Sequence, residues 1–547
     1  MKTIQNSNQN TFVKQASVLA LAGIFSRVIG FLYKLPLENL ITPEGTGIYG
    51  QGYTFYNFFL IVSSAGLPVA ISRMVSARTV LGEYREAHRV FKIALITASA
   101  LGLLCALLLG FGAPWLTALT GGESTYYTLV SLAPTVFIVA VMAVFRGYFQ
   151  GQGNAVPTAA SQIIEQIFNA VFSVIMAAWF MQITVGSAMN PYAIGAAGGT
   201  TGTGIGAVAG LFVLIWVYLL AKPGIQKRIK ADHTKTRPES GKKIAKELLL
   251  TALPIIAGTA IFSVSALLDT AIVKGRLMQG AGFAESWADY LFGLLSLRYV
   301  SMSTLPAAIS TAMATAAIPS IVASIALKDK KAVNSKINAA LRITMIISIP
   351  AAVGMGVLAE PITKMLFGSA DGAVLLQVGS ISIIFLALAQ IVTGMLQATG
   401  RLSIPVIGAA LGALVKIPLN YILVGIPEIN VLGAVISTIF CYVLASLFDW
   451  YMLTKSLKIQ LDLMAIIIKP LGCSLMMGLS CYVAYSLLYF VLSNNALATV
   501  FAIAVGGIVY FAYMILINGL TDEDILRFPA GGRILSLLKR APARQKR

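Results

Sequence analysis

The sequence predicts an all-α, polytopic membrane protein, and three observations support that class. Hydrophobic residues make up 57% of the 547 residues and charged residues only 11%, whereas charged residues make up about 25% of a typical soluble domain. Apolar runs about 20 residues long, enough to cross roughly 30 Å of hydrocarbon, recur along the whole chain. These runs do not alternate apolar and polar residues as membrane β-strands do, so we expect helices.

Fourteen apolar runs are predicted to be transmembrane helices, separated by polar or Gly/Pro-containing turns. The predicted spans are residues 12–36, 48–72, 91–113, 125–149, 157–182, 201–221, 247–273, 287–320, 337–360, 370–398, 404–425, 431–454, 463–492 and 496–519. The most polar interruption is 222–246, which follows the sixth run and holds nine Lys and Arg residues. We therefore expect this segment to link two halves of the chain.

Two motifs that occur twice indicate that the halves are repeats. GLPVAIS at 66–72 is repeated as TLPAAIS at 304–310, and GYFQGQGNAVP at 147–157 is repeated loosely as GMLQATGRLSIP at 394–405. The offsets, 238 and about 247 residues, each correspond to six spans. Because six is an even number, the two halves run in the same direction through the bilayer. Parallel repeats of this kind are typical of transporters, which bind substrate between the halves near the midplane.

The predicted organisation is two parallel six-helix lobes plus two C-terminal helices. Its parts are an N-lobe at 1–221, a basic cytoplasmic linker at 222–246, a C-lobe at 247–457, spans thirteen and fourteen at 458–520 and a basic cytoplasmic tail at 521–547. The tail is partly amphipathic, and attraction to anionic phospholipid headgroups is its simplest role.

The positive charge is distributed as in a plasma-membrane protein rather than a nucleic-acid-binding protein. The formal net charge is +19, but 33 of the 40 Lys and Arg residues fall on one side if both termini are cytoplasmic, and three fall in external loops. Lys274 is one of those three. Because an excess of Lys and Arg marks the cytoplasmic face, we expect a multi-pass protein with both termini in the cytoplasm and no nucleic-acid partner.

Four cations, Arg27, Lys34, Arg298 and Lys416, lie inside predicted spans, where each costs roughly 2.5–3.5 kcal/mol. Arg27 is about fifteen residues into its span, too deep for easy access to the headgroups. Lys34 lies near the outer end of the same span, so snorkelling to the headgroups is the alternative to an interior role. Because Arg27 and Lys34 are seven residues apart, they share one helix face, about 10 Å apart along the axis.

Two carboxylates, Asp269 and Glu165, are predicted to be cavity or coupling groups. The spans of Arg27 and Asp269 are counterparts in the repeat, so an ion pair between them is the purely structural alternative. The four cations outnumber the two carboxylates. This balance favours an anionic substrate near the midplane, where Arg and Lys match phosphate charge. A cation exporter is expected to show the opposite balance.

The sequence contains no catalytic or metal-binding pattern. It has no HExxH, Walker or Ser/His/Asp arrangement, and its four cysteines lie in apolar runs without metal or redox spacing. We therefore expect a transporter rather than an enzyme, with no metal and no cofactor. A coupling cation, sodium or proton, is left as an open alternative.

Two stretches carry a resemblance that covers essentially the whole chain. FSRVIGFLYK at 25–34 resembles the first span of the MurJ-type lipid II flippases of the multidrug/oligosaccharidyl-lipid/polysaccharide (MOP) exporter superfamily. FRGYFQGQGNAVPTAASQIIEQ at 145–166 resembles the turn between spans four and five in the Gram-positive YtgP/SpoVB branch. Its motif residues are Arg146, Gly147, Gln150, Gly151 and Pro157.

The resemblance implies a MOP/MATE-like fold in a bacterial plasma membrane, a cationic cavity with Arg27 at the position of a cavity arginine, and a lipid-tail groove shaped by spans thirteen and fourteen. Two features depart from the family pattern. An Arg–Asp pair of the Gram-negative proteins aligns with Tyr33–Lys34, and Arg298 lies near a family arginine rather than at its aligned position.

The leading hypothesis is a flippase that moves undecaprenyl-diphosphate-linked peptidoglycan precursor (lipid II) from the inner to the outer leaflet by alternating access. Its implied partners are lipid II, membrane phospholipids and the cell-wall synthesis machinery. One alternative is a flippase for another lipid-linked oligosaccharide of capsule, teichoic acid or spore cortex. Two others are a cation-coupled multidrug exporter and a non-transporting scaffold of the envelope machinery.

Overall fold

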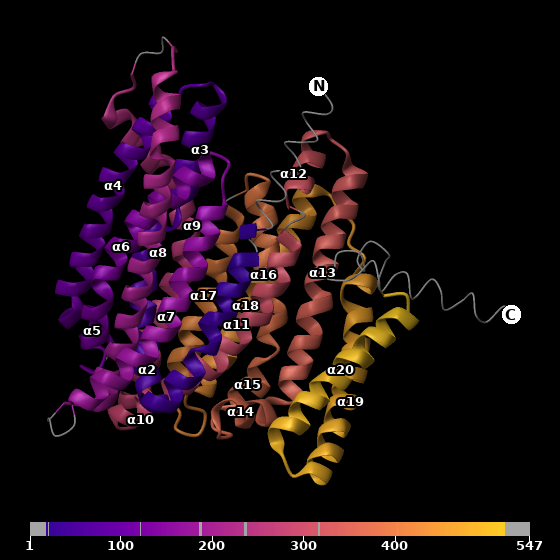
Figure 1. Ribbon diagram of the computed structural model, residues 1–547. Helices are drawn as coiled ribbons and strands as arrows, with labels where there is room; N and C mark the ends of the chain where they lie inside the picture. The colour runs from indigo at the N-terminus through magenta and orange to yellow at the C-terminus, as the bar shows by residue number, and fades with distance from the viewer. Residues whose placement is uncertain are drawn as a thin grey trace. The chain divides into compact units, whose positions relative to one another are not determined.

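The computed structural model describes residues 18–519, apart from 20, 121, 185–188, 235–237, 316–317 and 402. All regular elements among these residues are helices (Figure 1). After a helix at Leu21–Leu32, they are α2 (Lys34–Leu60), η1 (Ile61–Ala65), α3 (Leu67–Val80), α4 (Tyr84–Phe111), α5 (Ala113–Thr120), α6 (Tyr126–Gly151), α7 (Val156–Ile183), α8 (Pro191–Lys230), α9 (Gly241–Gln279), α10 (Glu285–Gly293), η2 (Leu294–Ser301), α11 (Met302–Thr315), α12 (Ile318–Ala326), α13 (Lys330–Val357), α14 (Ala359–Phe367), α15 (Ala373–Gly379), α16 (Ser382–Ala398), α17 (Ser403–Val424), α18 (Leu432–Leu457), η3 (Met464–Ile468), α19 (Lys469–Leu492) and α20 (Asn495–Leu516). The predicted basic tail and the start of span one lie outside the described residues.

Ten helices of the described chain are long and apolar enough to cross a membrane, or eleven if the bent pair α15–α16 is one span. The sequence-based count of fourteen is therefore not reached. One reason is that α2, η1 and α3 form a single apolar stretch of 47 residues, Lys34–Val80, while Leu21–Leu32 is short. Another is that the predicted span 287–320 is divided among four shorter helical segments.

The predicted turn between the first two spans is a sharp break inside α2. Thr42 has non-helical angles (φ 61°, ψ 171°) and is followed by Pro43. Proline disfavours the helical conformation of the residue before it, so the chain changes direction here although hydrogen bonding continues on both sides. Residues 34–41 thus belong with the end of predicted span one, and residues from 43 onward lead into span two.

Side-chain caps begin several of the long helices. Asn190 accepts hydrogen bonds from two backbone N–H groups of α8, Ser240 from one of α9, Asp329 from one of α13 and Asn494 from one of α20. Each cap satisfies a backbone donor that has no partner inside its helix, typically worth ~1 kcal/mol. Short polar residues in the turns therefore set where these apolar helices begin.

Both copies of the second repeated motif form the same backbone turn. Gly153 (φ 78°) and Gly400 (φ 81°) are left-handed residues that end α6 and α16. The next N–H groups, of Asn154 and Arg401, donate to the carbonyls five residues back, at 3.0 and 2.9 Å. This is the glycine-terminated helix end in which a 6→1 bond satisfies a free carbonyl. The two glycines are 247 residues apart in the sequence, which supports the internal repeat.

The first repeated motif also has the same local structure in both copies. A π-helical segment precedes it each time: η1 before Pro68 and η2 before Pro306. A proline in a helix lacks an N–H donor and crowds the carbonyl four residues earlier. In both copies the π-helical segment ends within a few residues of this proline, and such segments occur frequently at functional sites.

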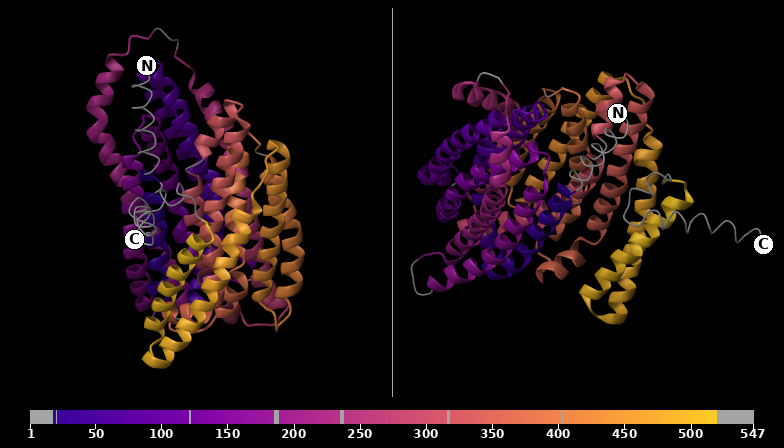
Figure 2. Two further views of the ribbon diagram at one scale, coloured as in Figure 1. Left: turned by 90° about the vertical axis from the view of Figure 1, so that its right-hand side faces the viewer. Right: turned by 45° about the horizontal axis from the view of Figure 1, so that its top comes forward.

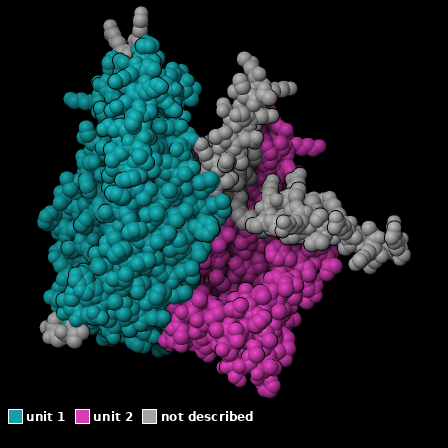
Figure 3. Space-filling view, viewed as in Figure 1, with its two compact units in different colours: residues 1–301, 413–437 teal, residues 302–412, 438–547 magenta. Residues whose placement is uncertain are grey.

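The described chain groups into two compact units (Figure 3). Unit 1 comprises residues 1–301 and 413–437, and unit 2 comprises 302–412 and 438–547, so α17 and α18 each contribute to both. The predicted division into an N-lobe and a C-lobe remains a prediction. The predicted linker 222–246 is largely helical, because α8 continues to Lys230 and α9 begins at Gly241.

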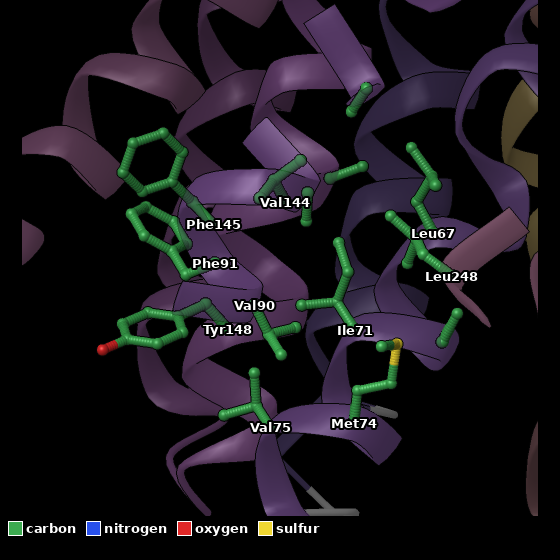
Figure 4. Packing of buried hydrophobic residues seen from close by; sticks show 14 of the residues in the cluster. Leu67, Ile71, Met74, Val75, Val90, Phe91, Val144, Phe145, Tyr148 and Leu248 are labelled. Atoms are coloured by element: carbon green, nitrogen blue, oxygen red, sulfur yellow. The ribbon is translucent and has the colours of Figure 1, made fainter. Parts of the chain in front are cut away.

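The largest apolar core of unit 1 lies among α3, α4, α6 and α9 (Figure 4). Phe91 and Tyr148 pack there with ring centroids 4.5 Å apart and ring planes tilted by 36°. Two motif glycines let α6 approach α3 closely: a Cβ at Gly147 would lie 2.9 Å from the Ile71 Cβ, and a Cβ at Gly151 would lie 2.7 Å from the Val75 Cβ. The glycines of the second motif are thus packing residues, as small residues are in membrane helix pairs.

Polar contacts outside the membrane helices attach the segment between α8 and α9 to α3 and α4. Asp232 accepts a hydrogen bond from the backbone N–H of Arg85 at 2.9 Å and from the hydroxyl of Thr234. Arg78 pairs with Glu239. The Thr234 hydroxyl, followed by the Arg85 N–H, lowers the pKa of Asp232 to about 2. Because this pKa lies below its usual value of 3.8, the stabilising effect of the carboxylate is present above about pH 4 and is lost as the pH falls through about 2.

Asp232→Ala is expected to loosen the segment and to make trypsin cleave at the Lys and Arg residues of 222–246 about fivefold faster, the factor for one hydrogen bond of ~1 kcal/mol. Cleavage rates are measured on the full-length protein in detergent at neutral pH. Thr234→Val removes one of the bonds and is expected to give a smaller increase. Equal cleavage of Asp232→Ala and the unmodified protein would contradict the prediction.

Candidate functional site

The first cluster of buried charges joins the start of α2 to η2. Arg298 Nε donates to Glu38 Oε1 at 2.7 Å, and the two side chains are only 4% and 3% exposed. One turn earlier on α2, Lys34 Nζ donates to Ser301 Oγ at 3.1 Å. Lys34 and Arg298 are thus brought together as predicted cavity cations. The sequence did not identify Glu38 as the partner of Arg298, although Glu38 lies on the same helical stripe as Arg27 and Lys34.

The second cluster links α9 to α17 and α18. Lys416 Nζ pairs with Asp269 Oδ2, and Asn420 Nδ2 donates to Asp269 Oδ1 at 2.7 Å. Asn420 Oδ1 in turn accepts from Ser437 Oγ at 2.7 Å. The suggested Arg27–Asp269 ion pair is therefore wrong, because Lys416 and Asn420 take the two oxygens of Asp269. The repeat related the spans of Arg27 and Asp269 but carried no information on α17.

Arg27 is exposed on the helix Leu21–Leu32. Among the described residues it has no hydrogen bond and no carboxylate within 4 Å. Lys34 likewise has no carboxylate within that distance in the described part of the chain, and its only hydrogen bond there is to the neutral Ser301. Of the four predicted cavity cations, Arg27 and Lys34 are therefore the two that keep their charge uncompensated by a neighbouring carboxylate.

Glu165 belongs to a local brace between α6 and α7. Its Oε2 accepts from Arg146 Nη2 at 2.7 Å, and Arg146 Nε donates to Ser161 Oγ at 3.0 Å. Gln150 Nε2 lies 3.4 Å from Thr158 Oγ1 across the same turn. These contacts, together with Pro157 in the first turn of α7, hold the two helices around Gly153. Arg146 and Gln150 thus make contacts that brace α6 against α7, and Glu165 pairs with Arg146 at this turn. A coupling role for Glu165 stays a prediction.

A third cluster was missed entirely by the sequence analysis. Lys274, assigned to an external loop, lies in α9, which continues to Gln279. Its side chain is fully buried and its Nζ lies 2.8 Å from Asp289 Oδ1. Gln51 Nε2 and Ser124 Oγ also donate to Asp289, at 2.7 and 3.0 Å. Since apolar sequence ends near Val273, no hydropathy pattern shows that a charged residue beyond it is buried.

Glycines allow α2 and α10 to approach closely beside this third cluster. A Cβ at Gly47 would collide with the backbone carbonyl of Asp289, and a Cβ at Gly293 would collide with the carbonyl of Pro43. The Lys274–Asp289 ion pair and the close backbone packing therefore lie side by side at one end of these helices, and both hold α10 against its neighbours.

Unit 2 contains an apolar cavity of about 370 Å³ between α13, α14, α19 and α20. Its lining includes Ile347, Pro350, Met355, Met477, Ile503 and Phe511. Tyr510 presents its ring to the cavity while its hydroxyl donates to the Ile346 carbonyl at 2.9 Å. Helices α19 and α20, the yellow hairpin of Figure 2, are the predicted spans thirteen and fourteen. The cavity suits an apolar chain rather than a charged group.

In the described part of the chain, no group of three or more His, Cys, Asp or Glu side chains is arranged to hold a metal ion. The buried acidic groups instead face ammonium, guanidinium, amide and hydroxyl donors. What the site offers chemically is fixed positive charge and hydrogen-bond donors within an apolar helix bundle. These features suit the binding of an anion.

Comparisons with known proteins agree with this arrangement. A family model described as polysaccharide biosynthesis protein matches residues 12–325, and the model MatE matches 299–422. The chain is 27% identical over 518 residues to the lipid II flippase MurJ of Bacillus subtilis (strain 168), covering 90% of this chain and 93% of that protein. It is 26% identical over 534 residues to stage V sporulation protein B of the same organism, covering 96% and 99%.

Solved structures show the same fold. A structure of the lipid II flippase MurJ in an inward closed conformation superposes with a TM-score of 0.62 at 16% identity, covering 91% of this chain and 98% of that one. This likeness concerns the fold alone. Because the polysaccharide biosynthesis model covers more than half of the sequence, the chain belongs to the polysaccharide biosynthesis protein family, a multi-pass membrane family of the MOP exporter superfamily whose members are transporters and not enzymes.

Proposed function

We propose that this protein is a flippase that moves a lipid-linked oligosaccharide diphosphate across the plasma membrane by alternating access, with lipid II as its leading substrate. The observation that carries the proposal is the pair of cations Arg27 and Lys34, which have no carboxylate within 4 Å among the described residues. In this scheme the fourteen predicted spans form two six-helix lobes plus two C-terminal helices, and both termini are cytoplasmic.

A diphosphate headgroup needs such cations to cross the membrane. Burying an unpaired charge in an apolar medium is prohibitive, whereas charge-assisted hydrogen bonds from Arg and Lys to phosphate are among the strongest available. Arg27 and Lys34 are the direct contacts in our proposal. Arg298 and Lys416 already neutralise Glu38 and Asp269, so they support the site's shape and reach the headgroup only if those ion pairs open.

The apolar cavity of unit 2 is the proposed place of the polyprenyl tail. Its volume of about 370 Å³ and its lining by α13, α19 and α20 suit a segment of an acyl or isoprenoid chain. The headgroup is held by cations and the tail by apolar side chains, so each part of an amphipathic substrate meets matching chemistry.

The identity of the saccharide is the least constrained part of the proposal. The relatives named a lipid II flippase and a sporulation protein have nearly equal identity to this chain, 27% and 26%. A capsule, teichoic-acid or spore-cortex intermediate is therefore the alternative cargo. A cation-coupled drug exporter is disfavoured, since Arg27 and Lys34 would repel a cationic drug.

Depletion of the protein in its native host tests the cargo. We expect lipid II to accumulate in the inner leaflet, measured as the lipid-linked precursor that stays inaccessible to an external enzyme or probe. Accumulation of a capsule or teichoic-acid intermediate with unchanged lipid II distribution would refute lipid II as the cargo and leave the flippase class standing.

Arg27→Ala is expected to lower the flipping rate in reconstituted vesicles about tenfold or more, because one charge-assisted hydrogen bond contributes about 1.5–3 kcal/mol. Lys34→Ala should have a similar effect, and Arg27→Lys should be milder than Arg27→Ala. The matched control is Lys364→Ala, which removes an exposed cation on α14. Rates for Arg27→Ala and Lys364→Ala that both equal the unmodified protein's would exclude Arg27 from the substrate path.

A further inference from the structure

Asp449 is a carboxylic acid buried deep inside unit 2. It lies on α18 and is 2% exposed. The end of α18 is Leu457, eight residues further on, which places the carboxyl about 12 Å from that end along the helix axis. None of the groups proposed to bind substrate touches it.

In the part of the chain that the structure describes, the carboxyl has one hydrogen bond. Its Oδ2 accepts from Thr393 Oγ1 of α16 at 3.3 Å. Its Oδ1 has no hydrogen-bond partner within the described ranges and lies against α17 at Gly408, where a Cβ would collide with that oxygen. Among the described residues no cation lies within 4 Å of either oxygen. The Asp449 carboxyl therefore lies between helices α16 and α17.

The helices that pack against Asp449 carry few charges. Helix α16 has no ionisable side chain. Helix α17 has Lys416 and Tyr421, of which Lys416 lies eight residues beyond Gly408 and pairs with Asp269. Helix α18 itself carries Cys441, Tyr442, Tyr451 and Lys455, and the Lys455 Nζ lies 5.5 Å from the Tyr451 ring centroid. Arg401, in the turn between α16 and α17, donates to the Ser456 carbonyl at 3.0 Å.

An ionised carboxylate is not stable in such surroundings. Burying an unpaired charge costs so much that the group neutralises instead, and one weak neutral hydrogen bond does not offset that cost. Two carboxylates that are buried to a similar degree, Glu38 and Asp289, each face a cation. Asp449 differs from them because no cation lies within 4 Å of it among the described residues, and a bound proton neutralises the carboxyl without needing such a partner.

We propose that Asp449 is a proton-binding site of the transport cycle: it is a neutral carboxylic acid in this conformation and releases its proton to water when the packing of α17 against α18 opens. In that step the O–H bond breaks, the proton goes to water and a carboxylate remains, with no redox change. The transport role rests on the proposed function, whereas the protonation itself does not.

Infrared spectroscopy of the full-length protein without substrate tests the protonation. At neutral pH the unmodified protein should show the C=O stretch of a protonated carboxylic acid, and Asp449→Asn should lack it. Thr393→Val, which removes the hydrogen bond, should shift the band. The matched control Asp462→Asn changes an exposed carboxylate that caps the start of η3 and should leave the band intact. Identical spectra for the unmodified protein and Asp449→Asn would overturn the proposal.

Vesicle assays test the coupling, with a fluorescent undecaprenyl-diphosphate disaccharide as the probe. A pH difference of one unit across the vesicle membrane should bias flipping by up to about tenfold. Asp449→Asn should flip without a gradient but lose this bias, and Asp462→Asn should keep it. Gradient-dependent flipping by Asp449→Asn, or gradient-independent flipping by the unmodified protein, would overturn the proposal. A protein that does not flip the probe at all would refute the proposed function instead, and the infrared band would still decide whether Asp449 is protonated.

Discussion

Lys274→Met is expected to destabilise the protein by about 3–5 kcal/mol, the cost of leaving one member of a buried ion pair without its partner. Lys274 and Asp289 are 0% and 1% exposed, so water cannot solvate the carboxylate that remains. Gln51 and Ser124 still donate to Asp289, but neutral donors do not replace an ammonium group. The quantity measured is the free energy of unfolding of the protein in mild detergent, which is obtained by denaturant titration.

Two controls separate this effect from a general sensitivity to losing a lysine. Lys364→Met breaks an ion pair with Glu360 whose side chains are 46% and 60% exposed, and it should cost at most about 1 kcal/mol. The double variant Lys274→Met with Asp289→Leu removes both charges and should recover much of the lost stability, since apolar replacements of buried pairs are often neutral or stabilising. If Lys274→Met costs no more than Lys364→Met, the buried pair is not a stabilising contact.

Glu38→Gln is expected to destabilise the protein by about 3 kcal/mol or more, because it strands the Arg298 guanidinium between α2 and η2. The glutamine keeps the shape of the Glu38 side chain and one acceptor oxygen. The loss of stability therefore reports the missing charge rather than changed packing. The same unfolding measurement applies. Glu360→Gln, at the exposed pair with Lys364, is the matched control and should change stability by less than about 1 kcal/mol.

Glu38→Gln should also change transport in the opposite sense to Arg27→Ala. Removing the Glu38 carboxylate makes the surroundings of Lys34 and Arg298 more positive by one charge, so we expect tighter binding of a diphosphate-linked probe and slower release. Binding is measured at temperatures where the variant is still folded. The variant Glu38→Met with Arg298→Met should regain stability but not the tighter binding. Unchanged binding in Glu38→Gln would mean that Arg298 does not reach the substrate when its ion pair is removed.

The class of the fold could be predicted from local sequence features. Apolar length and the absence of alternation require helices, because backbone groups in hydrocarbon must bond within their own segment. The two copies of each repeated motif also share local structure: the turns at Gly153 and Gly400 have matching hydrogen bonds, and a π-helical segment precedes the proline in both copies of the first motif. Such features depend on a few adjacent residues, so a sequence displays them directly.

The number of spans was less accessible to sequence analysis. The break at Thr42 falls within an apolar stretch that continues on both sides, and η2 divides the predicted eighth span into shorter segments. Hydropathy averages over about twenty residues, so it registers apolar length but not the direction of the helix axis. Breaks at single residues are therefore invisible to it.

The sequence alone established that four cations, Arg27, Lys34, Arg298 and Lys416, lie within apolar runs of a membrane protein. It did not establish which of these cations have a neighbouring carboxylate and which are available to bind an anionic ligand. Arg298 is 260 residues from Glu38 and Lys416 is 147 from Asp269, and no local pattern relates positions so far apart. Whether a buried charge is neutralised depends on a partner within about 4 Å in space. Only the tertiary packing of α2 against η2 and of α9 against α17 decides that, and among the residues with a described structure it gives Arg27 and Lys34 no neighbouring carboxylate.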